Sequence, residues 1–396
     1  MSEDKRDNLL RRGWRKVREA GTRRLAISGL IVAAALAFGY FSWSLPISGS
    51  AERALYDARL YFQADREPIP PDPRVVMVVF DDQTLIAAKK RSPFDRGLLA
   101  QALRNLDSLG PKAIGIDILF DQPQDEDADL VSTLRAMKTP VAVGYADVAT
   151  NAGEIGFEQQ KFLESFLGRL EGSRARPGSV RLDDIYGVTR RFPPLDAELP
   201  PSLGRAMLAA AGESARTLPG YEGAIRYRLE KYEGEGIAPK LRIDTFFDNG
   251  IVADPEVREL LRGQIAGRYV LIGGDVVDYD RVATPLSETA DTVRPPGVQV
   301  HVEMMQQMLD GERFRHVSPL VLWTLTYLIV AMGVLTALLE WGTWRVLTFV
   351  VAQFLLIAGI PVAMQFLGVD TMGVPAFGWF VAWTLAFLAV TAVARA

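Results

Sequence analysis

Long apolar blocks without a formal charge stand near both ends of this chain of 396 residues. Two of them have 21 residues and two have 22, and they cover residues 25–45, 319–339, 346–367 and 372–393. About 20 residues of α-helix cross the hydrocarbon core of a bilayer. The pattern therefore predicts four transmembrane helices, a short N-terminal tail (1–24) and one large region (46–318) between the first two spans.

Within 46–318 the pattern changes to short apolar runs that alternate with amphipathic segments. Runs typical of strands buried on both faces occur at 74–82 (RVVMVVFDD), 114–120 (IGIDILF), 140–146 (PVAVGYA) and 267–275 (GRYVLIGGD). Leucines at helical spacing follow the first run, with Ser92 as expected cap, Pro93 in the first turn and Gly110 at the end. The acidic stretch 125–130 predicts the start of a second helix. This order predicts an α/β domain with a mostly parallel sheet and helices on its faces.

Other segments are less regular. Apolar side chains of 50–62 form one helical stripe, so the first span is expected to continue outward as a stalk until Pro and Asp residues of 67–73 end it. Residues 177–195 are typical of strands and turns, and 200–213 of a helix. Residues 297–312 (GVQVHVEMMQQMLDGE) predict a strand that passes into a helix.

The distribution of basic residues predicts orientation. The first 24 residues hold nine Lys or Arg against four acidic residues, so the positive-inside rule places the tail in the cytoplasm. Residues 46–318 are then periplasmic, and three further crossings return the C-terminus to the cytoplasm of a bacterial inner membrane. A cleaved signal peptide is the alternative for the first block, since small residues follow at 48–51. The block is longer than a signal peptide's apolar region of about 7–15 residues, which favours an uncleaved anchor.

Composition excludes several classes of function. A net charge of −4 gives no electrostatic basis for binding nucleic acid. The absence of cysteine excludes disulfides, thiolate metal sites and cysteine nucleophiles. The two histidines, His301 and His316, are expected in the core and at the membrane border, where they form neither a metal cluster nor a catalytic triad. The predicted spans lack a conspicuous ionisable residue near their middle, which argues against a transporter or proton pump.

Carboxylates cluster where the predicted strands end. Asp81 and Asp82 end the first strand, Asp275 ends the late strand, Asp280 follows it, and Asp117 lies inside the second strand. Ligands of open parallel sheets bind beyond the carboxyl ends of the strands. We expect these residues either to bind a cationic ligand or a divalent cation, or to be paired internally by Arg96, Arg281 or backbone amides. The sequence predicts no cofactor and gives no support for a particular metal.

Five blocks in a fixed order resemble the extracytoplasmic CHASE sensor domain of the second type (CHASE2). They are 80–82 (FDD), 93–123 (PFDRGLLAQALRNLDSLGPKAIGIDILFDQP), 186–195 (YGVTRRFPPL), 267–286 (GRYVLIGGDVVDYDRVATPL) and 295–311 (PPGVQVHVEMMQQMLDG). Similar receptors have one span before the sensor, about three after it, and a cytoplasmic adenylate or diguanylate cyclase or kinase. The resemblance implies a sensor and no ligand, and it favours Asp117 and Asp280 as site residues because they lie within the matching blocks.

The leading hypothesis is therefore a non-enzymatic membrane receptor module that transmits an unknown signal through its spans to a cytoplasmic cyclase or kinase, in cis or in trans. A homodimer in the lipid bilayer is expected. Small residues of the first span (29, 33–35, 37 and 39) would allow close helix approach, either between two chains or within one. The alternatives are an envelope scaffold or partner-binding membrane protein and a metal-dependent periplasmic hydrolase.

Overall fold

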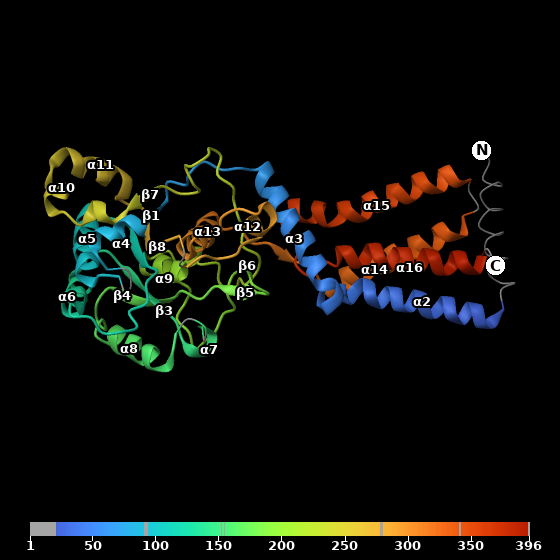
Figure 1. Ribbon diagram of the computed structural model, residues 1–396, viewed down its shortest axis with the longest axis horizontal. Helices are drawn as coiled ribbons and strands as arrows, with labels where there is room; N and C mark the ends of the chain where they lie inside the picture. Colours follow the sequence, from blue (N-terminus) through green and yellow to red (C-terminus); the bar gives the residue numbers. More distant parts are fainter. Residues whose placement is uncertain are drawn as a thin grey trace. The chain divides into compact units, whose positions relative to one another are not determined.

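The computed structural model describes residues 21–90, 94–151, 153, 155–277, 280–339 and 342–394. The chain divides into two compact units, each with its own interior (Figure 1). We name residues 61–313 the α/β unit, and the residues up to 60 together with those from 314 onward the helical unit. Most of the basic tail, and the expected helix cap at Ser92 and Pro93, lie outside the described residues.

A six-stranded sheet forms the centre of the α/β unit, in the order β4–β3–β2–β8–β1–β7. Its strands are β1 (Val75–Asp81), β2 (Ala113–Ile116), β3 (Val141–Tyr145), β4 (Ala175–Ser179), β7 (Lys240–Arg242) and β8 (Tyr269–Asp275). Each pair of neighbours is parallel, and the register places Asp81 of β1 beside Asp275 of β8. This confirms the expected mostly parallel sheet.

Helices cover both faces of the sheet, which explains the continuous apolar runs of its strands. One face packs against α5 (Arg96–Leu109), α6 (Asp127–Ala136), α8 (Phe157–Gly168) and α11 (Pro255–Ile265). The other face packs against α9 (Leu203–Ala210) and α13 (Gly297–Asp310) (Figure 1). A Cβ atom at Gly273 of β8 would lie 2.6 Å from the Cβ atom of Val298, so glycine there lets α13 lie directly on the sheet.

Three local expectations are corrected. Helix α5 begins at Arg96 and is capped by Asp95, whose side chain accepts a 3.0 Å hydrogen bond from the Leu98 amide. Strand β2 ends at Ile116, so Asp117 follows the strand instead of lying inside it. The segment expected as strand and then helix is helical throughout α13, which is buried around nearly its whole circumference. Burial on all sides removes the helical periodicity that would have distinguished it from a strand.

Shorter elements complete the α/β unit. They are α4 (Asp82–Ala88), α7 (Val148–Asn151), β5 (Asp183–Ile185), β6 (Val188–Arg191), η2 (Ser214–Arg216), η3 (Ile243–Phe246), α10 (Asn249–Ala253) and α12 (Pro285–Ala290). Strands β5 and β6 form an antiparallel hairpin.

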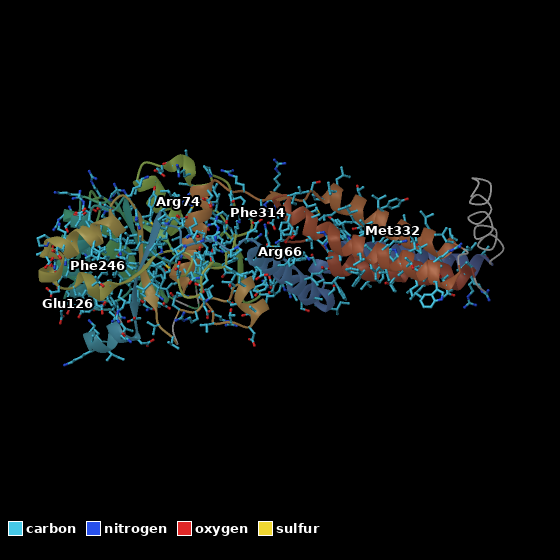
Figure 2. All side chains as sticks on the ribbon, turned by 90° about the horizontal axis from the view of Figure 1, so that it is seen from above. Arg66, Arg74, Glu126, Phe246, Phe314 and Met332 are labelled. Carbon is cyan, nitrogen blue, oxygen red and sulfur yellow. The ribbon has the colours of Figure 1, made fainter. Side chains whose placement is uncertain are left out.

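The helical unit contains four helices long and apolar enough to cross a membrane, as the four uncharged blocks predict. They are α2 (Thr22–Phe41), α14 (Pro319–Leu338), α15 (Thr343–Phe366) and α16 (Ala376–Ala394). Figure 2 shows mostly carbon on the side chains around these helices, near the labelled Met332. A short parallel pair, β9 (Arg315–His316) with β10 (Val369–Asp370), joins the start of α14 to the end of α15.

Polar side chains connect these helices inside the unit. The indole N–H of Trp379 donates to Thr326 at 2.9 Å, and that of Trp383 donates to Gln353 at 2.6 Å. Gln353 in turn donates to Thr336 at 2.8 Å, which links α14, α15 and α16. Such hydrogen bonds stabilise helix association where water is absent.

The helix after the first span is not a direct continuation of it. Helix α2 ends at Phe41, a 3₁₀ turn η1 (Ser42–Ser44) follows, Leu45 is extended, and α3 (Pro46–Arg66) begins anew. The expected continuous stalk is thus interrupted. On α3 the carboxylate of Glu52, which is 0 % exposed, accepts hydrogen bonds from the backbone N–H groups of Phe377 and Gly378 at 3.0 and 2.8 Å. It therefore occupies the positive N-terminus of α16.

Candidate ligand-binding site

A cavity of about 1200 Å³ lies at the carboxyl edge of the sheet, within the α/β unit. Its wall includes Phe80 and Gly274 from the ends of β1 and β8, the segment 117–122 after β2, and His301 of α13. Ligands of open parallel sheets bind at this edge, because loops after the strands diverge there. This cavity is therefore the candidate site.

Asp117 follows β2, but its backbone is still hydrogen-bonded to the neighbouring strand β8, and this places its side chain at the cavity. Its N–H donates to the carbonyl of Ile272 at 2.7 Å, one residue beyond the end of β2. The side chain, 11 % exposed, lines the cavity, and its Oδ1 lies 3.9 Å from Nε2 of His301. The strand thus holds this carboxylate in a defined place at the edge.

His301 projects from the first turns of α13 and is only 2 % exposed. Burial lowers the pKa of the imidazole to about 4, so the ring is neutral at pH 7. Its Nδ1 has no hydrogen-bond partner among the residues that the structure describes. The sequence indicated a buried histidine, but not its position beside Asp117.

Asp280 also lines the cavity. It adopts a φ of 55°, and its carbonyl accepts a 3.1 Å hydrogen bond from the N–H of Gly297 at the start of α13. A Cβ atom at Gly297 would lie 2.9 Å from Oδ1 of Asp280. Glycine at this position therefore leaves room for the carboxylate of Asp280 beside the start of α13.

Arg96 lines the cavity but does not pair with the predicted carboxylates. The side chain is 1 % exposed; its Nη1 forms an ion pair with Asp127, and its Nη2 donates to the carbonyl of Gln122 at 2.6 Å. Its guanidinium lies 5.2 Å from the ring centroid of Phe120 and 5.4 Å from that of Phe166. Arg96 therefore joins α5, α6 and the loop after β2.

Two more of the predicted carboxylates have partners within the fold. Asp81 caps α4 through hydrogen bonds from the N–H and hydroxyl of Thr84, at 2.8 and 2.9 Å. Burial opposes ionisation of Asp81, but these bonds outweigh it and hold the pKa of the carboxyl below its usual value. Asp82 accepts a 3.1 Å hydrogen bond from the N–H of Val277.

Asp275 is held between two cations. Lys240 pairs with one carboxylate oxygen, and Arg281 lies 2.9 Å from the other. Of the six predicted site residues, the structure thus places Asp117, Asp280 and Arg96 in the wall of the cavity. Asp81, Asp82 and Asp275 are at the same edge of the sheet but are not among the described residues of that wall.

Aromatic side chains in the wall were not anticipated. Phe80 and Phe94 stack with ring centroids 4.5 Å apart, and Phe120 belongs to the segment after β2. Phe80 and Phe120 each stand at the end of an apolar run, where a buried strand opens toward the carboxyl edge. Their position at the ends of these runs is the feature of the sequence from which their place in the wall could have been predicted.

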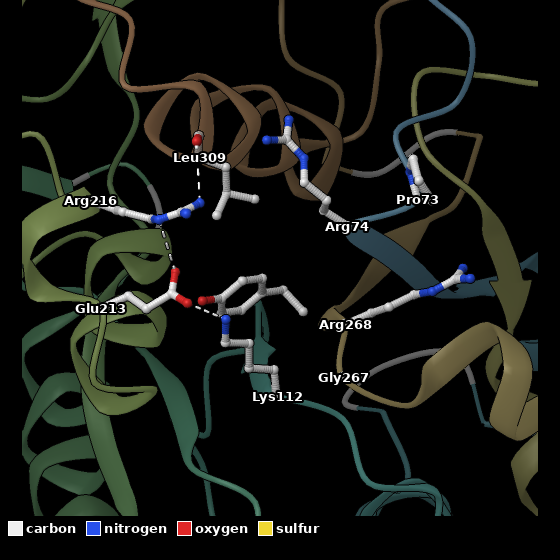
Figure 3. A pocket seen from close by; sticks show the side chains of 9 residues that line it. Pro73, Arg74, Lys112, Glu213, Arg216, Gly267, Arg268 and Leu309 are labelled. Carbon is white, nitrogen blue, oxygen red and sulfur yellow. Dashed lines mark hydrogen bonds and ion pairs between the residues drawn. The ribbon is translucent and has the colours of Figure 1, made fainter.

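A second cavity, of about 250 Å³, lies at the amino edge of the sheet (Figure 3). Within its wall Lys112 pairs with Glu213 and Arg216 lies 3.3 Å from the same carboxylate, whereas Arg74 lies 2.6 Å from Asp310, which is outside the wall. Because it is much smaller than the carboxyl-edge cavity, we treat it as the weaker candidate.

The described residues contain no group of three or more His, Cys, Asp or Glu side chains that could hold a metal ion. The cluster of carboxylates predicted from the sequence is dispersed by the contacts above. The described part of the chain therefore adds no support for the divalent cation considered as a ligand.

Comparison with known proteins identifies the domain. A family model described as the CHASE2 domain matches residues 30–339. No curated protein and no solved structure matches the chain. The matched region covers the whole α/β unit, most of α2 and all of α14.

Proposed function

Because the chain belongs to the CHASE2 family, we propose that it is the sensory and membrane portion of a bacterial receptor, without catalytic activity of its own. The family match carries this proposal, joined to the four apolar helices and to the cavity at the carboxyl edge of the sheet. In this proposal the α/β unit binds the signal, and the helical unit passes it to a cyclase or kinase, in cis or in trans.

We place the α/β unit in the periplasm and both termini in the cytoplasm of the inner membrane. The nine basic residues of the first 24 support this orientation through the positive-inside rule. Reporter fusions after residue 60 and after residue 394 test it. Some reporters are active only in the cytoplasm. Activity of such a reporter fused after residue 60 would contradict the receptor proposal.

Glu52 supports a route of transmission. Helix α3 leads the chain from the first apolar helix into the α/β unit, and Glu52 joins α3 to the N-terminus of α16. A movement of α3 would therefore act on the last apolar helix. A signal can drive such a movement only if it binds the two states with different affinity.

We propose that the receptor is a homodimer. On α2, Ala35 and Gly39 are buried inside the chain's own helical unit, whereas Gly29, Ala33 and Ala37 are exposed along a separate stripe. Small residues spaced by four allow two helices to approach closely. Crosslinking of Ala33→Cys chains in membranes tests this, with Leu30→Cys, beside the stripe, as the matched control.

The distribution of tryptophan gives a direct test of transmission. None of the seven tryptophans lies between residues 61 and 313, so tryptophan emission reports on the rest of the chain. A ligand bound in the α/β unit should shift this emission in wild type, and the shift should shrink in Glu52→Gln. A ligand that binds the α/β unit without any shift in emission would contradict transmission to the helical unit.

A further inference from the structure

We propose that helix α3 lies in the headgroup layer of the membrane, with an exposed apolar stripe against lipid and Arg59 at a lipid phosphate. The inference requires only that α2 crosses a bilayer. It goes beyond the proposed function, because it needs neither a signal nor an output unit. A reversed orientation of the chain would move α3 to the other leaflet and leave the inference unchanged.

Contacts within the helical unit hold α3 at the level where the apolar helices end. Only the turn η1 and Leu45 separate α3 from Phe41, the last residue of α2. Tyr40 of α2 stacks on Trp323 near the start of α14, with ring centroids 3.9 Å apart. Aromatic residues of this kind gather where the hydrocarbon of a membrane meets water. Glu52 of α3 binds the N-terminus of α16, which places α3 beside the same end of these helices.

Helix α3 also changes direction at this level. Within the helical unit, its part up to residue 60 leaves the end of α2 at a steep angle instead of extending the line of α2 (Figure 1). Interfacial helices lie in the plane of the membrane surface, with the apolar face at the boundary between headgroups and acyl chains. The change of direction brings α3 closer to that plane than a straight stalk would.

One face of α3 is apolar and is not covered by the rest of the chain. Ile47, Ala51, Leu55 and Ala58 follow one another at spacings of four, four and three residues, so they share one face of the helix. Ile47 is 82 % exposed and Leu55 39 %, whereas Glu52, on a different side of the helix, is buried. We name these four residues the α3 stripe. Lipid beside the first apolar helix would cover it and remove its apolar surface from water.

Arg59 places a charge next to the α3 stripe, four residues after Leu55. Burial lowers the pKa of its guanidinium to about 10, so the group is still charged at pH 7. The charges of Glu52 and Asp57 attract it, but Nε and Nη2 have no hydrogen-bond partner among the described residues. Buried donors without an acceptor cost free energy. The oxygens of a lipid phosphate are acceptors that match the planar guanidinium, which can donate two parallel hydrogen bonds to them.

A lipid surface accounts for the stripe and the arginine together. An arginine side chain can extend along apolar surface, so that its charged end lies among the headgroups and its methylene groups lie at the hydrocarbon boundary. If the α3 stripe were instead the seam of a dimer, Arg59 would stand at its border, and a buried cation without an acceptor destabilises an interface. Lipid also lies beside α3 in every oligomeric state, because the residues before it form an apolar helix.

Spin labels test the position of the α3 stripe. The chain has no cysteine, so one introduced cysteine carries one nitroxide. In the full chain in phospholipid nanodiscs, power saturation compares collisions with oxygen, which dissolves in lipid, and with a nickel complex, which stays in water. The ratio of oxygen to nickel collisions should be several-fold higher at Leu55→Cys than at Ser50→Cys. Ser50 is the matched control, since it is exposed on α3 outside the stripe.

Lipids with and without phosphate test Arg59. In maltoside micelles, which lack phosphate, added phosphatidylglycerol should raise the melting temperature read by tryptophan emission, because a ligand of the folded state stabilises it. The rise should be much smaller in Arg59→Gln. It should be unchanged in Arg258→Gln, whose exposed side chain on α11 donates to the carbonyl of Ser108 at 3.2 Å. A galactolipid with the same acyl chains and no phosphate should raise the melting temperatures of wild type and Arg59→Gln equally.

Three results would overturn the inference. A label at Leu55 that meets the nickel complex as often as a label at Ser50 would place the stripe in water. Spin–spin broadening at Leu55 that disappears on dilution with unlabelled chain would mean that a second copy covers the stripe. Equal rises of wild type and Arg59→Gln with phosphatidylglycerol would exclude the phosphate contact. Retained circular dichroism confirms that each variant folds.

Discussion

Glu303 offers the sharpest test of the interior of the α/β unit. This residue lies in the middle of α13, 2 % exposed, and its Oε2 has no hydrogen-bond partner among the described residues. Burial raises the pKa of its carboxyl to about 8, although the charge of Arg228 opposes the change. The carboxyl is therefore mostly protonated at pH 7, whereas in the unfolded chain it ionises near its usual value of 4.5.

The sign of the pH effect follows from that difference. Because the folded pKa exceeds the unfolded one, the folded chain binds the extra proton between pH 4.5 and about 8. The free energy of unfolding then falls as pH rises through this range and is constant above it. At about 1.4 kcal/mol per pH unit, the difference amounts to about 5 kcal/mol. This is an upper limit, since entry of water relieves part of the burial.

Glu303→Gln mimics the protonated form at every pH. We expect the variant to match wild type near pH 5 and to unfold at higher urea concentration near pH 9, as followed by circular dichroism of the full chain in detergent. Tryptophan emission, which originates outside residues 61–313, shows whether the helical unit stays folded. Glu259→Gln, at an exposed position of α11, is the control. Equal pH dependence of wild type and Glu303→Gln would refute the reasoning.

Three further changes test other contacts. Arg96→Met should cost up to about 3–5 kcal/mol in urea unfolding because it leaves the buried carboxylate of Asp127 with only the longer contact to Arg169, at 3.6 Å. The double variant with Asp127→Leu should recover part of the loss, and no recovery would contradict the pairing. The pKa of His301 is about 4 in the folded chain and 6.5 in the unfolded chain. The free energy of unfolding should therefore fall by up to about 3 kcal/mol as pH drops from 6.5 to 4. His301→Gln should lack this fall in thermal unfolding followed by circular dichroism. Glu52→Ala leaves two backbone N–H groups of α16 without their acceptor, which should cost about 1–3 kcal/mol for each group. The melting temperature read by tryptophan emission should therefore drop further in Glu52→Ala than in Glu52→Gln. Equal drops in the two variants would contradict the role of Glu52 as a helix cap.

Hydrophobic pattern predicts the sheet because its signal is local. Strands β1, β3 and β8 are continuous apolar runs, and the segments after β1 and β2 have helical spacing or helix-start residues. Right-handed parallel connection then leaves few alternatives. Parallel strands have their carboxyl ends at one edge of the sheet, and ligands bind beyond that edge, so the region of the candidate site could also be predicted.

The pairing of charges could not be predicted in the same way. Arg96 was expected beside the strand-end carboxylates, yet its partner Asp127 is 31 residues away on the neighbouring helix. Asp275 is shared by Lys240 and Arg281, which come from different segments. These ion pairs depend on how helices and loops pack against one another, and that packing cannot be read from the spacing of charged residues along the chain.

Helix α13 shows why the least legible segment matters most for the proposed function. Its first turns carry Gly297 and His301 in the wall of the cavity, Glu303 is buried in its middle, and Asp310 at its end contacts Arg74 at 2.6 Å. A packed interior does not deform continuously, so a ligand that contacts His301 acts on the helix as a whole. The chain then continues from α13 to α14, just as it enters the α/β unit through α3. Under the proposed function, a ligand bound at the carboxyl edge would thus contact the element that leads the chain back to its apolar helices.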